Sequence, residues 1–233
     1  MSIERRGFET FGRFRLDWLD AHHHFSFGHY LDPARMGVGP LRVWNDDHIE
    51  PGKGFDPHPH RDMEIITYVR KGAITHRDHL GNEGRTEAGD VQVMSAGQGI
   101  VHAEYNLEDD PTQIFQIWIT PKERGIEPRW EKRTFPRGPD SDRLIPMASG
   151  EPGVTGALPI HQDATLYAAA IRPGQTVEHG FAPDRRGYLV PARGRVVVNE
   201  VELAPRDAAV VTDEARLRIT ALEEAEILLA DLP

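Results

Sequence analysis

The sequence predicts an all-β protein made of two similar antiparallel, jelly-roll-like β-barrels. Short apolar runs rich in Val, Ile, Leu and aromatic residues recur along the chain, and Gly- and Pro-rich clusters separate them. Strands at this spacing are typical of a β-sandwich or a β-barrel. No long segment repeats apolar residues at the helical period of 3.6, so we expect few and short helices.

The apolar runs define the expected strands in order along the chain. They are residues 63–69, 90–94, 113–119, 166–171, 187–192, 195–203, 208–212, 216–222 and 226–232. Each run ends at a turn-forming cluster such as "LGNEGR", "SAGQG" or "PDRRG". Strands of this length joined by tight turns favour antiparallel pairing.

A stretch rich in Pro, Gly, Ser and charged residues divides the chain. We expect an N-terminal domain at residues 1–134, a crossover at 135–153 and a C-terminal domain at 154–233. Ten of the 12 histidines lie at or before residue 102, and only His161 and His179 follow the crossover. The N-terminal domain is therefore the one that we expect to carry a site.

Composition excludes several kinds of function. The chain has no cysteine, so disulfides, thiolate catalysis and Cys-type metal sites are ruled out. A formal net charge of −10 argues against a duplex-binding surface, and we expect no direct nucleic-acid binding. No apolar run reaches transmembrane length and no secretory signal opens the chain, so we expect a cytoplasmic protein without a membrane partner.

Two pairs of alternating polar residues form the candidate site. His58 and His60 are two residues apart and share one face of an extended strand. Pro59 between them lacks an N–H donor, which predicts a strand start, an edge strand or a bulge. His102 and Glu104 repeat the alternation in "GIVHAEYN". On neighbouring strands, these groups would offer imidazole and carboxylate ligands to a divalent first-row metal.

The residues alone leave the choice of carboxylate open. Glu64 lies six residues after His58 and shares its face if no bulge intervenes, whereas Glu104 is two residues from His102. The carboxylate that does not bind would act as a base, support a ligand or be an ordinary strand residue. His76 and His79 flank a turn, where hydrogen bonds that stabilise the turn are a simpler role than a second metal site.

The spacing of these residues resembles the cupin motifs and, in detail, the pirin family. The pattern Gly52, five residues, "HPH", three residues, Glu64 is similar to the first cupin motif. The second motif departs from the general pattern because Ser95 replaces a proline and four residues separate Gly97 from His102. The segments "HPHRDMEIITYV", "HRDHLGN" and "GDVQVMSAGQGIVHAEYN" all resemble pirin-like bicupins.

This resemblance implies two cupin barrels with metal in the N-terminal one only. It implies the ligands His58, His60, His102 and Glu104, whereas the general cupin pattern would use Glu64. Bacterial pirin-like proteins of this type are known for quercetin 2,3-dioxygenase activity. The resemblance therefore implies a dioxygenase of flavonol-like substrates that releases carbon monoxide, with Glu104 taking the proton of the substrate hydroxyl.

The resemblance also implies the cofactor and an alternative function. Fe(II) is the first expectation, while Zn, Ni, Co, Mn and Cu also suit three imidazoles and one carboxylate. Animal pirins are iron-binding nuclear co-regulators, so a metal- or redox-responsive binding protein is the alternative. An open, apolar cavity beside the metal would favour the enzyme, and a closed site would favour the sensor. We expect a monomer that takes a small flavonol-like molecule and dioxygen.

Overall fold

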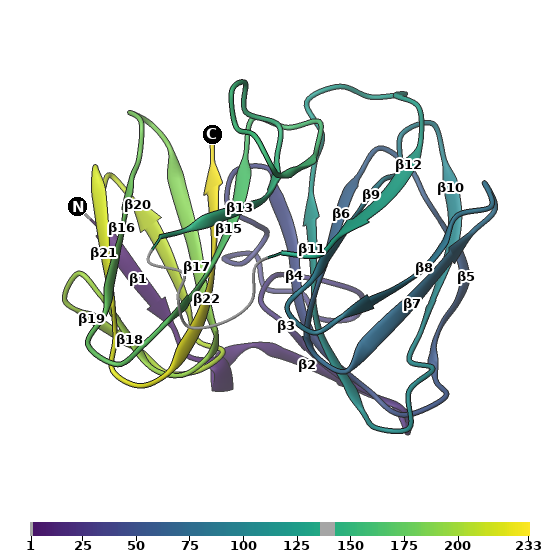
Figure 1. The fold of residues 1–233 in the computed structure, drawn as a ribbon, viewed down its shortest axis with the longest axis horizontal. Coiled ribbons are helices and arrows are strands. Elements are labelled where there is room, and N and C mark those ends of the chain that lie inside the picture. The colour runs from purple at the N-terminus through teal and green to yellow at the C-terminus, as the bar shows by residue number, and fades with distance from the viewer. Residues whose placement is uncertain (1, 136–142) are drawn as a thin grey trace. The chain divides into compact units, whose positions relative to one another are not determined.

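The computed structural model describes residues 2–135 and 143–233 and is almost entirely β-structure (Figure 1). A single 3-10 turn, η1 (Phe8–Thr10), interrupts the strands within these residues. The predicted all-β class with few short helices is therefore confirmed. Within these two ranges, no helix is long and apolar enough to cross a membrane.

The chain forms two compact units that differ from a simple division into halves. Of the described residues, the N-terminal unit comprises 11–135 and 158–162, and the C-terminal unit comprises 2–10, 143–157 and 163–233. Residues 2–10, grouped by the sequence prediction with the N-terminal domain, join the C-terminal unit because β1 (Ser2–Arg6) pairs with β20 (Ala208–Thr212). Residues 136–142 of the predicted crossover lie outside the described residues.

The N-terminal unit is a β-sandwich of two sheets rather than a closed barrel. The larger sheet has the order β12-β9-β6-β11-β4-β3-β2 and the smaller has β5-β10-β7-β8 (Figure 1). Their strands are β2 (Gly12–Arg15), β3 (Leu19–His23), β4 (Leu41–Ile49), β5 (Gly54–His60), β6 (Glu64–Lys71), β7 (Ala73–Asp78), β8 (Glu83–Glu87), β9 (Val91–Ser95), β10 (Ile100–Tyr105), β11 (Thr112–Ile119) and β12 (Arg129–Arg133). The short β14 (Leu158–Pro159) also belongs to this unit.

The C-terminal unit repeats this topology. Its larger sheet runs β1-β20-β17-β22-β15-β13 and its smaller sheet runs β16-β21-β18-β19. The remaining strands are β13 (Ile145–Ser149), β15 (Thr165–Ile171), β16 (Thr176–Gly180), β17 (Arg186–Arg193), β18 (Val196–Val198), β19 (Val201–Leu203), β21 (Arg216–Ala221) and β22 (Ala225–Leu232).

One predicted strand, residues 195–203, is two strands. β18 and β19 pair as a tight hairpin in which Val198 faces Val201. Asn199 turns the chain with a φ of 52°, a left-handed conformation that asparagine tolerates better than most residues. Its Oδ1 also accepts a hydrogen bond of 2.9 Å from the backbone N–H of Arg218. The sequence pattern missed this turn because a single Asn interrupts an otherwise strand-forming run.

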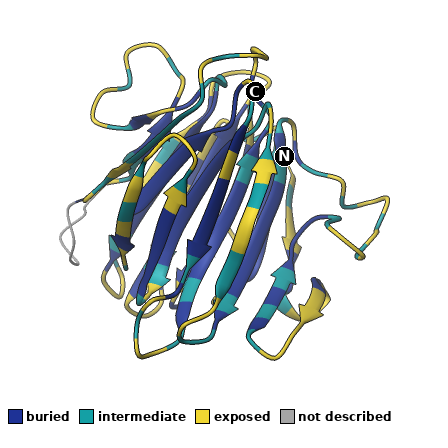
Figure 2. Cartoon of the chain, turned by 90° about the vertical axis from the view of Figure 1, so that its right-hand side faces the viewer, coloured by how far each residue is buried: buried dark blue, intermediate teal, exposed yellow. Residues whose placement is uncertain are grey.

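The strands are buried where the two sheets of a unit face each other. Figure 2 shows the central strands largely in dark blue and the connecting loops largely in yellow. In the C-terminal unit, one apolar cluster includes Leu189, Ala209, Leu217, Ile227 and Leu229. The N-terminal unit has smaller apolar clusters, one around Ile74 and Ile114 and another around Ile65 and Met94. Polar side chains occupy part of its interior instead.

Candidate metal centre

Two neighbouring strands bring the three predicted histidines together. β5 and β10 are antiparallel, with His58 opposite His102 and His60 opposite Ile100. The alternation of side chains along β5 places His58 and His60 on one face. β5 lies at the edge of the smaller sheet, which is one of the three positions predicted from Pro59, since an edge strand does not need that N–H.

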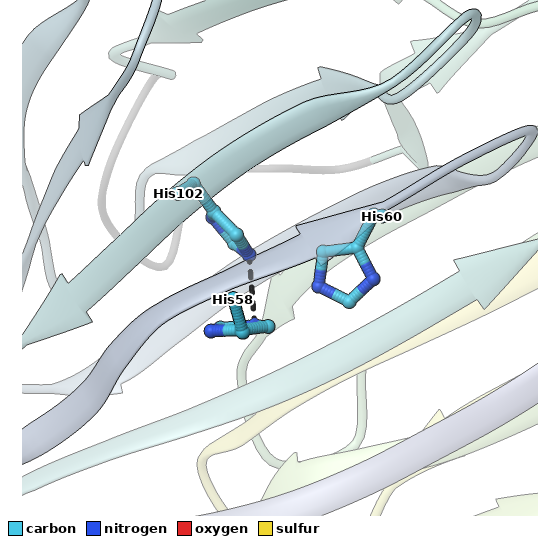
Figure 3. Close-up of side chains that lie close together, drawn as sticks. All are labelled: His58, His60 and His102. Carbon is cyan, nitrogen blue, oxygen red and sulfur yellow. Dashed lines mark hydrogen bonds between the residues drawn. The ribbon is translucent and has the colours of Figure 1, made fainter.

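The three imidazole rings converge on one point (Figure 3). One ring nitrogen from each of His58, His60 and His102 can be chosen so that all three lie within 4.8 Å of one another. The Nε2 atoms of His58 and His102 are 3.1 Å apart. Two nitrogens each about 2.1 Å from one ion and at right angles would be about 3.0 Å apart, so the spacing fits a shared metal.

The other ring nitrogens have partners that fix the orientation of two of the rings. Nδ1 of His58 lies 2.7 Å from the carbonyl oxygen of Asp56 and donates to it. Nδ1 of His102 lies 3.3 Å from Nδ1 of His76, whose Nε2 lies 3.0 Å from the Asp78 carboxylate. This chain of contacts leaves Nε2 of His58 and of His102 free to bind a metal. Support of this kind is usual around metal-binding histidines.

Burial keeps two of the imidazoles uncharged. It lowers the pKa of His60 to about 4, with further lowering from His102 and His58. It lowers the pKa of His102 to about 3, with further lowering from His58 and His76. Both rings are therefore neutral near pH 7, and the neutral ring is the form that binds a metal.

Glu104 is buried beside the histidines and is held by side-chain donors. Its Oε1 accepts hydrogen bonds from Nε2 of Gln92, at 2.6 Å, and from the Thr67 hydroxyl, at 3.2 Å. Its Oε2 accepts one from Nε2 of Gln116, at 2.8 Å. These uncharged donors stabilise the carboxylate without cancelling its charge, so Glu104 could bind a metal or accept a proton.

Glu64 faces different partners. Its Oε2 accepts a hydrogen bond of 2.7 Å from the Ser95 hydroxyl, and its Oε1 lies 3.4 Å from Nδ1 of His161. Glu64 is fully buried, and burial raises its pKa. Of the two candidate carboxylates, Glu104 lines the same cavity as the three histidines, and Glu64 is not part of that wall.

The three donors to Glu104 belong to a polar row across the larger sheet. Register pairs Gln92 with Thr67, Thr67 with Gln116, and Gln116 with Asn45, the last member of the row. No residue of this row was predicted as part of the site. The available signal was a polar residue inside a buried apolar run, as in "DVQVM" and "QIFQIWI".

A cavity of about 410 Å³ opens beside the histidines and Glu104. Apolar and aromatic side chains make up much of its wall, including Phe27, Phe55, Ile65 and Trp118. This size and lining suit a small, flat organic molecule. The wall includes all four residues of the predicted site.

The remaining histidines have other surroundings. His76 is fully buried, whereas Nδ1 of His79 accepts a 3.0 Å hydrogen bond from the backbone N–H of Val101. In the C-terminal unit, Nε2 of His179 lies 2.7 Å from the Asp231 carboxylate, which Arg185 also contacts. Within the described residues, the two clusters able to hold a metal both lie in the N-terminal unit: His58, His60 and His102, and His76, His102 and Glu104.

Comparisons with known proteins identify relatives that share the sequence and the two-unit fold. Residues 5–119 match the family model described as Pirin, and residues 147–232 match the one described as Quercetinase C-terminal cupin domain. The chain is 56% identical over 98% of its length to a pirin-like protein of Caulobacter vibrioides, covering 99% of that protein. It is 42% identical over 93% of its length to quercetin 2,3-dioxygenase of Escherichia coli, covering 92% of that protein.

A solved structure also matches along the whole chain. The bacterial pirin YhhW from Escherichia coli, in complex with nickel(II), superposes with a TM-score of 0.93 and 41% identity. The match covers 100% of this chain and 99% of that one. The two-unit fold described above is therefore that of a known metal-binding protein.

Proposed function

The chain belongs to the pirin family, and from that premise we propose that it is a metal-dependent dioxygenase that cleaves flavonols and releases carbon monoxide. The names of its relatives support the substrate class, since quercetin 2,3-dioxygenase of Escherichia coli is 42% identical to it. The observation that carries the proposal is the convergence of three imidazoles on an apolar cavity of about 410 Å³, with the Glu104 carboxylate on the wall of the same cavity.

His58, His60, His102 and Glu104 are the proposed metal ligands. Three imidazoles and a carboxylate suit Fe(II), our first expectation, and also accept Ni, Zn, Co, Mn or Cu. A bound divalent metal supplies Lewis-acid stabilisation to the 3-hydroxyl and 4-carbonyl edge of a flavonol. The partners of His58 and His102 at Nδ1 hold those rings ready for that role.

Glu104 is also the proposed base. Its carboxylate takes the proton of the substrate's 3-hydroxyl, and the amide groups of Gln92 and Gln116 hold both of its oxygens in place. The deprotonated ring is electron-rich and reacts with dioxygen. Both oxygen atoms remain in the ring-opened product, and carbon 3 leaves with its own oxygen as carbon monoxide.

The aromatic wall of the cavity orients the flat substrate and keeps bulk water from the reacting edge. Phe27 and Trp118 meet edge to face, with ring centroids 5.5 Å apart, and Trp118 also contacts His60. An open cavity beside the histidines favours an enzyme over a metal-responsive sensor, which would need no room for a substrate.

Turnover of quercetin under oxygen tests the proposal. The wild-type protein and His60→Ala are each loaded with Fe(II), Ni, Co, Mn, Cu or Zn, and quercetin loss and carbon monoxide release are measured. We expect turnover with at least one metal and a loss of at least about 100-fold in His60→Ala, since even outer partners of a ligand contribute 10- to 100-fold.

His48→Ala is the matched control, since His48 lies in the same unit but outside the cavity wall. It should retain wild-type turnover. Absence of turnover with every metal would refute the enzyme proposal and leave the sensor as the better explanation.

A further inference from the structure

A second cavity of about 510 Å³ lies beside the first in the N-terminal unit. The two cavities share four wall residues, Phe27, Asn45, Asp47 and Phe55. None of the proposed metal ligands lines the second cavity. The second cavity therefore offers room beside the metal site for a part of a substrate that does not reach the metal.

Three polar groups on the wall of the second cavity are buried. His23, Asn45 and Asp47 are 5%, 5% and 3% exposed. In the described part of the chain, His23 Nδ1, Asn45 Oδ1 and Asp47 Oδ1 have no hydrogen-bond partner. Buried polar atoms are nearly always paired in folded proteins. Three such atoms on one wall indicate that a bound ligand supplies their hydrogen-bond partners.

The three groups lie together for a structural reason. Asn45 and Asp47 are two residues apart on β4 and share its interior face. His23, on β3, is the register partner of Asn45. The cluster is therefore held by regular strands and not by a loop, which favours a preorganised site.

The buried Asp47 and His23 on the wall of the second cavity are uncharged at neutral pH. Burial raises the pKa of Asp47 to about 8, with further raising by the charges of Asp46 and Glu104. Burial lowers the pKa of His23 to about 4. Arg13, which also lines the cavity, is paired with Asp20 at 2.6 Å. This wall suits neutral donors and acceptors better than a carboxylate or a phosphate.

The rest of the wall is aromatic. Phe14, Phe27, Tyr30 and Phe55 all line the cavity. His23 meets Phe27 edge to face, with ring centroids 5.1 Å apart. Aromatic side chains around a few buried polar groups are suited to a flat ring that carries hydroxyl groups.

We propose that the second cavity binds the distal, hydroxylated ring of the flavonol, with Asn45 and Asp47 as the residues that recognise its hydroxyl groups. This inference rests on the proposed function, because it places the chelating edge of the same molecule in the first cavity. Asn45 and Asp47 are then specificity-determining residues. They distinguish flavonols by the hydroxyl groups of a ring that takes no part in the cleavage.

The test compares three probes that share the chelating edge. Quercetin has two hydroxyl groups on its distal ring, galangin has the same skeleton with none there, and 3-hydroxy-4-pyranone has no distal ring. Dissociation constants are measured on the metal-loaded protein without oxygen, from quenching of the fluorescence of Trp18 and Trp118, which line the first cavity. Binding is thus separated from turnover.

We expect the wild type to bind quercetin about 10-fold more tightly than galangin, the effect of one or two hydrogen bonds. Asp47→Leu, similar in size but unable to form hydrogen bonds, should reduce that ratio to about one. Asp47→Asn keeps a donor and an acceptor and should retain most of the preference. His48→Ala, outside both cavities, should match the wild type.

A second variant tests the cavity itself. Ala21 is buried, lines only the second of the two cavities and faces Asp47 in register. Ala21→Leu should weaken the binding of quercetin and of galangin by about 10-fold or more, because the added methylene groups occupy the space that the distal ring needs. Binding of the pyranone should not change.

Two results would overturn the inference. One is equal binding of quercetin and galangin by the wild type. The other is an equal loss for both flavonols in Asp47→Leu, which would indicate a general structural effect. A protein that passes these binding tests but turns over no quercetin in oxygen would retain the second site and lose the dioxygenase proposal.

Discussion

The row of residues across the middle of the larger sheet is polar in one unit and apolar in the other. In the N-terminal unit, the row consists of Gln92, Thr67, Gln116 and Asn45. In the C-terminal unit, the row at the same place in the strand order consists of Ala209, Leu189, Leu229 and Tyr167. Gln116 and Leu229 are each the fifth residue of an eight-residue strand.

This difference shows that topology alone does not make the site. Both units place two sheets face to face in the same order. The C-terminal unit fills this part of the sheet interface with packed apolar side chains. The N-terminal unit keeps amide groups there, and these hold Glu104.

Glu104 and the buried Asp231 of the C-terminal unit also have different partners. In the C-terminal unit, Arg185 contacts Asp231 and Glu151, so a guanidinium offsets their charge. In the N-terminal unit, the donors to Glu104 are amides and a hydroxyl, which leave its charge available. The guanidinium of Arg185 forms an ion-pair cluster with its carboxylates. Glu104 has only uncharged donors, so its carboxylate suits a metal.

The largest difference in metal affinity is expected between two variants that each lose one histidine, one in each unit. His102→Ala should lower metal affinity by at least about 100-fold, because it removes a proposed ligand that also contacts His58 and His76. His179→Ala should leave affinity unchanged, since its ring nitrogen is bonded to Asp231. Metal content is measured by mass spectrometry and metal affinity by calorimetry for both variants. Equal losses in the two variants would contradict the assignment of the metal site to the N-terminal unit.

A reciprocal exchange tests the polar and apolar rows. Leu229→Gln should destabilise the protein by about 3 kcal/mol, since it places an amide in an apolar core. Gln116→Leu should destabilise the protein by about 1–3 kcal/mol, because Oε2 of the buried Glu104 loses its donor. It should also weaken metal binding about 10-fold by releasing Oε2 of Glu104.

Urea unfolding and metal titration measure the two variants of this exchange. A stable Leu229→Gln protein would show that the C-terminal interior tolerates polar groups. Packing would then not explain why this row is apolar in the C-terminal unit.

A pH-dependent effect on stability is expected at Asp47. Its pKa is raised to about 8 by burial, so between about pH 4 and pH 8 the folded protein holds a proton that the unfolded chain has lost. Wild-type stability should therefore fall as pH rises through this window, by at most about 1.4 kcal/mol per pH unit. Asp47→Asn removes this contribution, so its advantage over the wild type should grow with pH.

Unfolding free energies measured between pH 5 and pH 8 test the sign of this effect. Ala169 is two residues beyond Tyr167 on β15, as Asp47 is two residues beyond Asn45 on β4. Ala169→Ser, a small change in the other unit, serves as the control and should show no growing difference with pH. A pH-independent advantage of Asp47→Asn would contradict the assignment of a buried, protonated carboxyl.

Local sequence patterns predicted much of the fold. The alternation of apolar residues located β6, β9, β11, β15, β17, β20, β21 and β22, because the strand period is a property of neighbouring residues. The run 195–203 was predicted as one strand, since the turn at Asn199 has a weak signal. The strands β3 and β4, which carry His23, Asn45 and Asp47, were not predicted. Polar residues within them hide the usual apolar pattern.

Phe25 and Phe27 share a face of an extended chain, and the sequence alone leaves open whether they line a pocket or pack in a core. Phe25 is only 1% exposed. Phe27 instead lines both cavities. Two aromatic residues of the same kind, two positions apart, cannot be told apart until the neighbouring strands are in place.

By itself the sequence determined that His58 and His60 share a face, and that His102 and Glu104 share another. It did so because side chains alternate along any strand. Only the tertiary structure decided that β5 and β10 are neighbours, that Glu104 lines the cavity while Glu64 meets Ser95, and that Gln92 and Gln116 hold Glu104. Those contacts join strands far apart in the chain, and strand register, not local spacing, sets them.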